Sequence, residues 1–299
     1  MLHMIYSQTL RNLKIFLKDK ANIFFALLSP LIVLGLYILF LGRIQTDGLL
    51  SALQEMGVSG GEKEIRSFAD CWMLSGVMAS ACITVPLCAC GVMVQDRNRG
   101  IRADLAASPV PGWMPPAAYF FSVVAAGLII GFAVLVICLV WLAATGSWFL
   151  SVTDVLVLLG TLVLSVLSSS TLLVFVVGFL RTEGAFTGLN VILGTVIGFL
   201  IGAYMPLSVF PTGVQYVTLF VPGSYSAGIF RNCFMNGALD NIAQNISPEF
   251  ADALASQYAL KLNFFGTDMP AWVMAIVLGA TVLLFAAANL LAAKFRKKA

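Results

Sequence analysis

The side chains best placed to contact a partner lie in a compact charged segment, residues 96–111, between two long apolar runs. The segment reads DRNRGIRADLAASPVP, and it allows about two to three helical turns before Pro109 stops the helix. A short charged helix at the edge of an apolar run is typical of a docking element held at a membrane surface. Its charged side chains are Asp96, Arg97, Arg99, Arg102 and Asp104.

The chain lacks the residue patterns of common catalytic sites. It has no phosphate-binding loop and no dinucleotide fingerprint, and His3 is its single histidine. No ionisable residue lies in the middle of a predicted span, which argues against a proton relay and against a membrane-embedded enzyme. Cys88 and Cys90 have no further ligands nearby in sequence, so no metal site is predicted, and a disulfide between Cys71 and Cys233 stays open.

Composition places the chain in a membrane. Hydrophobic residues make up 60% and charged residues 10% of the chain, and its mean hydropathy is +0.96. A helix needs about 20 apolar residues to cross a bilayer core. We therefore expect an all-α polytopic membrane protein with a single transmembrane domain and six transmembrane helices. The expected spans are 22–42, 70–94, 117–144, 153–180, 186–204 and 270–293.

Basic residues indicate the orientation, since Lys and Arg accumulate on the cytoplasmic side. With both termini inside, twelve of the 17 Lys and Arg residues are cytoplasmic. The expected order is an interfacial helix (1–21), spans 1 and 2 (22–94), a cytoplasmic segment (95–116), spans 3–5 (117–204), an external hairpin and loop (205–269), and span 6 with a basic tail (270–299).

The residues before the first span predict an amphipathic interfacial helix. Its apolar face would enter the inner leaflet while its cations meet anionic headgroups. The two faces consist of Leu10, Leu13 and Leu17, and of Arg11, Lys14 and Lys18.

The long external segment predicts a re-entrant hairpin, because three prolines separate apolar pieces that are too short to span. Those prolines are Pro206, Pro211 and Pro222, and Arg231 is placed outside with this segment. After the hairpin, Ser247-Pro248-Glu249 predicts the start of a surface helix. The first external loop, around Gly48, Gly57, Gly60 and Gly61, is expected to be irregular.

Small residues at a spacing of four predict close helix approach. They occur at Gly194, Gly198 and Gly202 in the fifth span, and at Gly127 and Gly131 in the third. The spacing leaves open whether the partner is a helix of this chain or of a second copy.

The order of these features resembles the membrane subunits, or permeases, of type-2 ABC transporters, the ABC exporter type V fold. The most specific match is RGIRADLAASPV, residues 99–110, although Ile101 and Arg102 stand where the family often has Thr and Leu. The resemblance covers nearly the whole chain.

The resemblance implies that the charged segment is a coupling helix for a separate ABC ATPase subunit, which would bind ATP and Mg. It also implies a second permease copy, as a homodimer or with a related permease, and no nucleic-acid partner. Ile101 and Leu105 would form an apolar ridge for a groove on the ATPase, with charges at its rim. The coupling residues would be Arg97, Arg99, Gly100, Ile101, Arg102, Asp104, Leu105, Ser108 and Pro109.

In the family the pathway lies between the two permease copies, which makes Phe186, Thr187 and Asn190 candidates together with the three glycines of the fifth span. The external hairpin would cap the exit. Its gate candidates are Pro206, Phe210, Pro211, Tyr216, Phe220, Pro222 and Tyr225.

The function that these features favour is an ATP-driven exporter subunit for an amphiphile such as a drug, an antimicrobial peptide or a lipid-like molecule. A polysaccharide or lipid-linked glycan exporter of the same family is the alternative, and an ATP-independent channel or scaffold is the alternative of another class. The expected location is the cell membrane, a bacterial plasma membrane, with multiple spans and both termini cytoplasmic.

Overall fold

Helices carry most of this structure, because a backbone in hydrocarbon must satisfy its polar groups within its own segment. The computed structural model describes residues 2–56, 60–107, 110–258, 260, 262–264 and 267–296. Within them, six helices are long and apolar enough to cross a membrane, which confirms the predicted number. They are Leu28–Glu55, Glu62–Asn98, Met114–Thr145, Val152–Val177, Glu183–Leu200 and Ala271–Ala292.

The first two of these helices each combine several elements. The first contains α3 (Leu28–Leu36), a π-helical turn η1 (Tyr37–Leu41) and α4 (Gly42–Glu55). The second contains α5 (Glu62–Ala89) and α6 (Gly91–Asn98). The others are α8 (Met114–Thr145), α9 (Val152–Val177), α10 (Glu183–Leu200) and α14 (Ala271–Arg296).

The first span differs from its predicted range of 22–42. Residues 22–26 belong to a separate helix, α2 (Lys20–Ala26), and the span begins at Leu28. Pro30 has no N–H for the Ala26 carbonyl, so the helical hydrogen-bonding breaks between the two. The expectation of an irregular first external loop was wrong at Gly48, since α4 continues the helix to Glu55. Gly60 and Gly61 are irregular as expected, with positive φ, and Gly57 lies outside the described residues.

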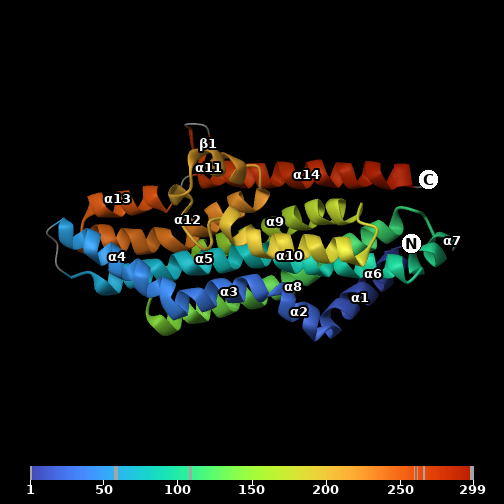
Figure 1. Cartoon of the computed structure of the whole chain (residues 1–299), viewed down its shortest axis with the longest axis horizontal. Helices are drawn as coiled ribbons and strands as arrows, with labels where there is room; N and C mark the ends of the chain where they lie inside the picture. Colours follow the sequence, from blue (N-terminus) through green and yellow to red (C-terminus); the bar gives the residue numbers. More distant parts are fainter. Residues whose placement is uncertain are drawn as a thin grey trace.

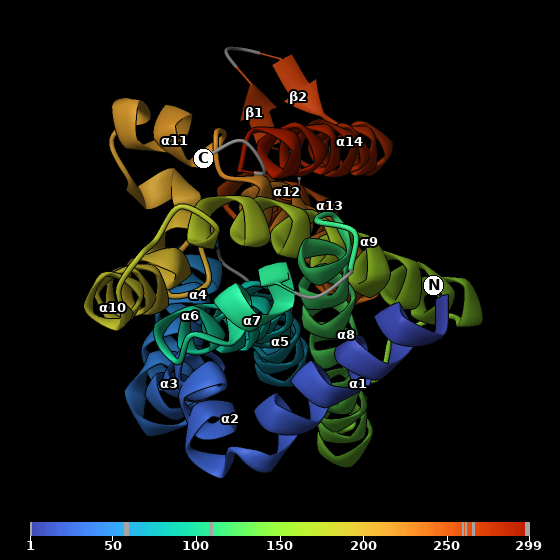
Figure 2. The same ribbon diagram turned by 90° about the vertical axis from the view of Figure 1, so that its right-hand side faces the viewer.

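Helix α5 forms the centre of the bundle, and its most apolar stretch is completely buried. It packs against α3, α8, α9 and α12, and Figure 2 shows the other helices arranged around it. Gly127 and Gly131 of α8 lie directly against Val166 and Leu162 of α9. For these two glycines, the close partner is therefore a helix of the same chain.

The segment between α10 and α14 turns back along α5. It contains η2 (Leu207–Val209), α11 (Thr212–Thr218), α12 (Pro222–Asn245) and α13 (Pro248–Gln257). Ala203 lies against Gly76 of α5, whereas Gly223 at the start of α12 lies against Ile83, seven residues further along α5. That is about 10 Å of return at 1.5 Å per residue. The depth of this hairpin in a bilayer stays a prediction.

The hairpin segment ends in elements of two kinds. Ser247 caps α13, since its hydroxyl accepts from the Phe250 N–H, which confirms the predicted helix start. A short antiparallel pair of strands follows, which the sequence analysis did not predict. The strands are β1 (Leu262–Phe264) and β2 (Thr267–Met269). Cys71 and Cys233 are buried free thiols rather than a disulfide.

The two ends of the bundle carry different elements (Figure 1). Helices α4 and α13 lie at one end. At the other end lie α1 (Leu2–Lys18), α7 (Ile101–Ala107) and both ends of the chain. The two termini therefore share a side, and α7 is on that side with them.

Candidate functional site

The predicted docking segment forms a turn and a short helix at the end of the second span. Helix α6 ends at Asn98, Gly100 takes a positive φ of 79°, and α7 runs from Ile101 to Ala107. Glycine adopts that conformation at no steric cost, so the chain can change direction sharply between the two helices. Seven residues make about two turns.

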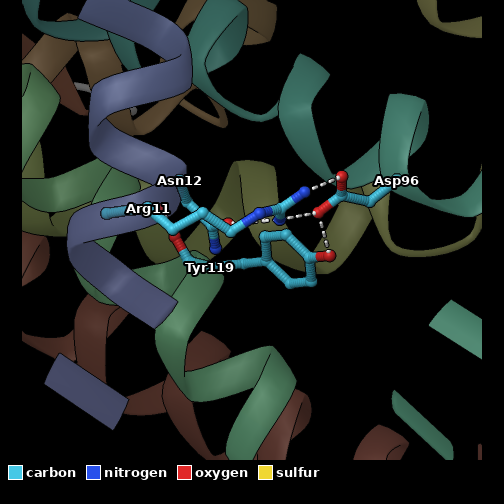
Figure 3. A network of polar contacts seen from close by, with 5 residues as sticks. Arg11, Asn12, Asp96 and Tyr119 are labelled. Carbon is cyan, nitrogen blue, oxygen red and sulfur yellow. Dashed lines mark hydrogen bonds and ion pairs between the residues drawn. The ribbon is translucent and has the colours of Figure 1, made fainter. Parts of the chain in front are cut away.

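A buried carboxylate anchors the base of this segment (Figure 3). Asp96 is 3% exposed and accepts hydrogen bonds from both terminal nitrogens of Arg11, with Nη2 at 2.9 Å from Oδ1. The Tyr119 hydroxyl donates to the same carboxylate at 2.7 Å, and Arg11 Nη1 also donates to Asn12. The pair raises the pKa of Arg11 further above its usual value, chiefly through the hydrogen bonds that Arg11 donates to Asp96. The network joins α1, α6 and α8.

Arg97, the next residue, connects the same helix to α9. Its guanidinium donates to the carbonyls of Leu180 and Gly178, the second at 3.0 Å. These carbonyls follow the C-terminal end of α9, where a cation is favoured. Arg97 is thus engaged within the bundle, and its predicted role as a rim charge for a partner stays a prediction.

The other predicted coupling residues lie at the surface of this end. Arg99 and Asp104 are exposed, and Ile101 and Leu105 are half-buried at a spacing of four. The structure does not describe the side chain of Arg102, nor Ser108 and Pro109, so those predictions lie outside the described residues.

Helix α1 is a helix as predicted, but Arg11 does not face outward with the two lysines. Arg11 forms the ion pair with Asp96, whereas the side chains of Lys14 and Lys18 are exposed. Leu10, Leu13 and Leu17 are half-buried, and the fully buried positions are Asn12 and Phe16. The helix packs along α8, so the leucines share their face with protein. Its place at the bilayer surface stays a prediction.

A groove of about 630 Å³ opens beside the docking segment. Helices α2 and α3 form one wall, α10 forms the other, and α5 and α6 form the floor. Four of the six predicted pathway residues line it, and Asn190 donates from Nδ2 to Cys88 Sγ on the floor at 3.5 Å. Those four residues are Phe186, Thr187, Asn190 and Gly194.

The other two predicted pathway glycines, Gly198 and Gly202, pack against side chains of the same chain. The ring of Tyr204 covers Gly198, where an added Cβ would lie 2.4 Å from it. Gly202 has a positive φ of 68° at the end of α10 and contacts Arg231. Neither lines the groove, so the prediction of one continuous flat glycine face was wrong.

The chemistry of the groove is amphiphilic. Apolar side chains such as Phe25, Ile32 and Val191 line it beside the polar Thr84 and Gln95. Charged residues also line it: Asp19, Arg99 and Glu183. Among the described residues, no group of His, Cys, Asp and Glu could hold a metal ion. The arrangement can hold a molecule with both apolar and polar parts.

The predicted gate residues occupy the turns around η2 and α11. Phe220 is 78% exposed, Pro211 is exposed, and Tyr225 is buried within α12. The others, Pro206, Phe210, Tyr216 and Pro222, are half-buried. A gate role for Tyr225 would require α12 to move.

Three of the described charged residues are buried, Asp70, Asp96 and Arg231, and the sequence analysis predicted none of them to be so. The sequence analysis grouped Asp96 with the surface charges of the predicted docking segment. Its partner Arg11 lies 85 residues away in sequence, and no local pattern connects the two. The sequence analysis placed Arg231 in an external loop, but its side chain is 1% exposed and lies within α12. The one available signal was its position in an otherwise uncharged apolar stretch.

Comparison with known proteins identifies the chain at the level of its family. The family model described as ABC-2 type transporter matches residues 5–235. A search of the curated proteins finds no match. The match begins in α1, includes all of α6 and α7 and the groove, and ends within α12. With six helices able to cross a membrane and a family match over most of its length, the chain belongs to the ABC-2 type transporter membrane domains and is a permease subunit of an ABC transporter.

Proposed function

We propose that this permease exports an amphiphile, driven by a separate ATPase subunit that docks on α7. The single observation that carries the proposal is the position of α6. This helix contributes Val94 and Gln95 to the groove and passes through Gly100 directly into α7. A force on α7 would therefore reach the floor of the groove through one short helix.

The network at the base of α7 makes such transmission efficient. Asp96 is bound to α1 and α8, and Arg97 is bound to the end of α9. A push on the Ile101 and Leu105 ridge would thus move several spans together rather than bend one loop. ATP and Mg would bind in the partner subunit.

A second permease copy would close the groove. Helix α10 is packed on one side only, and Val191 and Ile192 are each 60% exposed. A homodimer or a related permease would cover this face and enclose the pathway. The α7 end would be cytoplasmic, with both termini, in a bacterial plasma membrane.

The amphiphilic lining favours a drug, an antimicrobial peptide or a lipid-like molecule as substrate. The test is to reconstitute the permease with its ATPase in liposomes and to measure transport of three probes across the membrane. The probes are doxorubicin, a fluorescent phospholipid and a cationic antimicrobial peptide. ATP-dependent movement of at least one of them supports the proposal. ATP hydrolysis without movement of any of them, or ion flux without ATP, contradicts it.

A further inference from the structure

Arg231 of α12 is a buried cation without a counter-ion. Its side chain is 1% exposed, and in the part of the chain that the structure describes no carboxylate lies within ion-pair distance of it. Burial of a charge is unfavourable unless hydrogen bonds or an opposite charge compensate. The position of this guanidinium therefore needs an explanation.

The compensation comes from the end of α10, the helix that forms one wall of the groove. Arg231 Nη2 donates to the carbonyls of Ile201 and Gly202, the second at 3.1 Å. The last carbonyls of a helix have no partner within it and carry partial negative charge. Arg231 supplies both the donor and the positive charge that this end requires.

A second residue of α12 contacts the same end. Ser224, seven residues before Arg231 and on the same helical face, donates to the Leu200 carbonyl at 3.2 Å and to the Thr218 carbonyl at 2.7 Å. Three successive carbonyls, at residues 200–202, are thus held by one face of α12. Helix α10 also contacts α3, α5 and α6, but only Ile197 and Gly198 are buried within it.

The backbone at Gly202 is shaped for this contact. Its positive φ brings the carbonyl to Arg231, and an added Cβ would lie 2.6 Å from Nη2. Among the described residues, the other terminal nitrogen, Nη1, is buried and has no hydrogen-bond partner.

We infer that Arg231 is a positioning residue that couples the groove to the exit hairpin. Movement of α10 along the groove carries its terminal carbonyls, and Arg231 transmits that movement to α12 and so to η2 and α11. The inference rests on the proposed function, because it assigns the groove wall and the hairpin to one transport pathway.

The test is amide hydrogen exchange of the permease–ATPase complex, with and without ATP and vanadate. In the wild type, we expect nucleotide to change exchange in residues 197–204 and in residues 222–231 together. In Arg231→Met, the response of residues 197–204 remains, and that of residues 222–231 falls about fivefold or more. Arg231→Lys, which keeps the charge, restores part of it, and Arg66→Met, at an exposed arginine of α5, leaves both responses unchanged.

A simple structural role would change exchange in both states without altering the response to nucleotide. A wild-type response of residues 222–231 in Arg231→Met overturns the inference. If that variant cannot be isolated, Gly202→Ala displaces the same contact and gives the same test. A wild-type complex in which neither segment responds to ATP contradicts the proposed function itself, which distinguishes the two failures.

Discussion

Arg11 and Asp96 form an ion pair that joins the first helix of the chain to the last turn of α6, just before α7, the proposed docking helix. The Asp96 carboxylate is buried and the Arg11 guanidinium is partly exposed, so the pair lies at the boundary between the buried interior and the surface (Figure 3). It fixes α6 against α1 and α8 one residue before Arg97 fixes it against α9. Helix α7 therefore extends from a segment that is bonded to three other helices.

Arg11→Met should lower the free energy of unfolding by about 2 kcal/mol, because it leaves the Asp96 carboxylate buried without its cation. The measurement is an SDS titration of the permease in micelles. Arg11→Met combined with Asp96→Asn should cost less than the sum of the single changes, because the neutral amide no longer requires a counter-charge. Lys14→Met, at an exposed lysine of the same helix, is the control. Equal effects of Arg11→Met and Lys14→Met would show that the pair contributes little.

Arg97→Met should reduce export per ATP hydrolysed, because α6 loses its link to the carbonyls at the end of α9. ATP hydrolysis by the complex should remain. The comparison is Arg181→Met, at an exposed arginine just beyond those carbonyls. If both variants keep the wild-type ratio of export to hydrolysis, Arg97 has no part in transmission.

Gly194→Leu should obstruct the groove and lower export by about tenfold. That factor corresponds to a loss of about 1.4 kcal/mol in the free energy of substrate binding. The matched control is Gly188→Leu on the same helix. An added Cβ meets nothing within 4 Å at either position, but only Gly194 lines the groove. Stability should thus be similar in the two variants, and export of the best wild-type substrate should separate them. Equal export would place the pathway elsewhere.

Gly127→Ala should destabilise the permease by about 1–3 kcal/mol, because the added methyl overlaps Val166 of α9. The built Cβ lies 2.7 Å from Val166 Cγ1. Val166→Ala in the same chain should recover part of the loss. Gly160→Ala, which has open space around it, is the control for a glycine-to-alanine change in α9. The readout is again SDS titration, and no difference between Gly127→Ala and Gly160→Ala would contradict the close packing.

The sequence was informative wherever a pattern is local. Apolar runs predicted six spans, and Ser247-Pro248-Glu249 predicted the start of α13. Four of the six pathway candidates line a groove, and their role in a pathway stays a prediction. Contacts between distant residues were not predictable. Arg11 finds Asp96 only when α1 folds across α8, and Gly198 is covered by Tyr204 only because the chain turns sharply after α10. Arg231 was misplaced for a related reason, since α12 is buried by its packing against α5.

The proposed function requires that an ATPase subunit docks on α7 and drives this permease. The most direct measurement is purification of the tagged permease from its native membrane in mild detergent, with mass spectrometry of the proteins that accompany it, for the wild type and for Leu105→Asp. We expect an ATP-binding-cassette protein to co-purify in stoichiometric amount with the wild type and to be absent with Leu105→Asp. The variant permease should stay folded. A stable wild-type complex without any ATPase, or an ATPase retained equally by both, would contradict it.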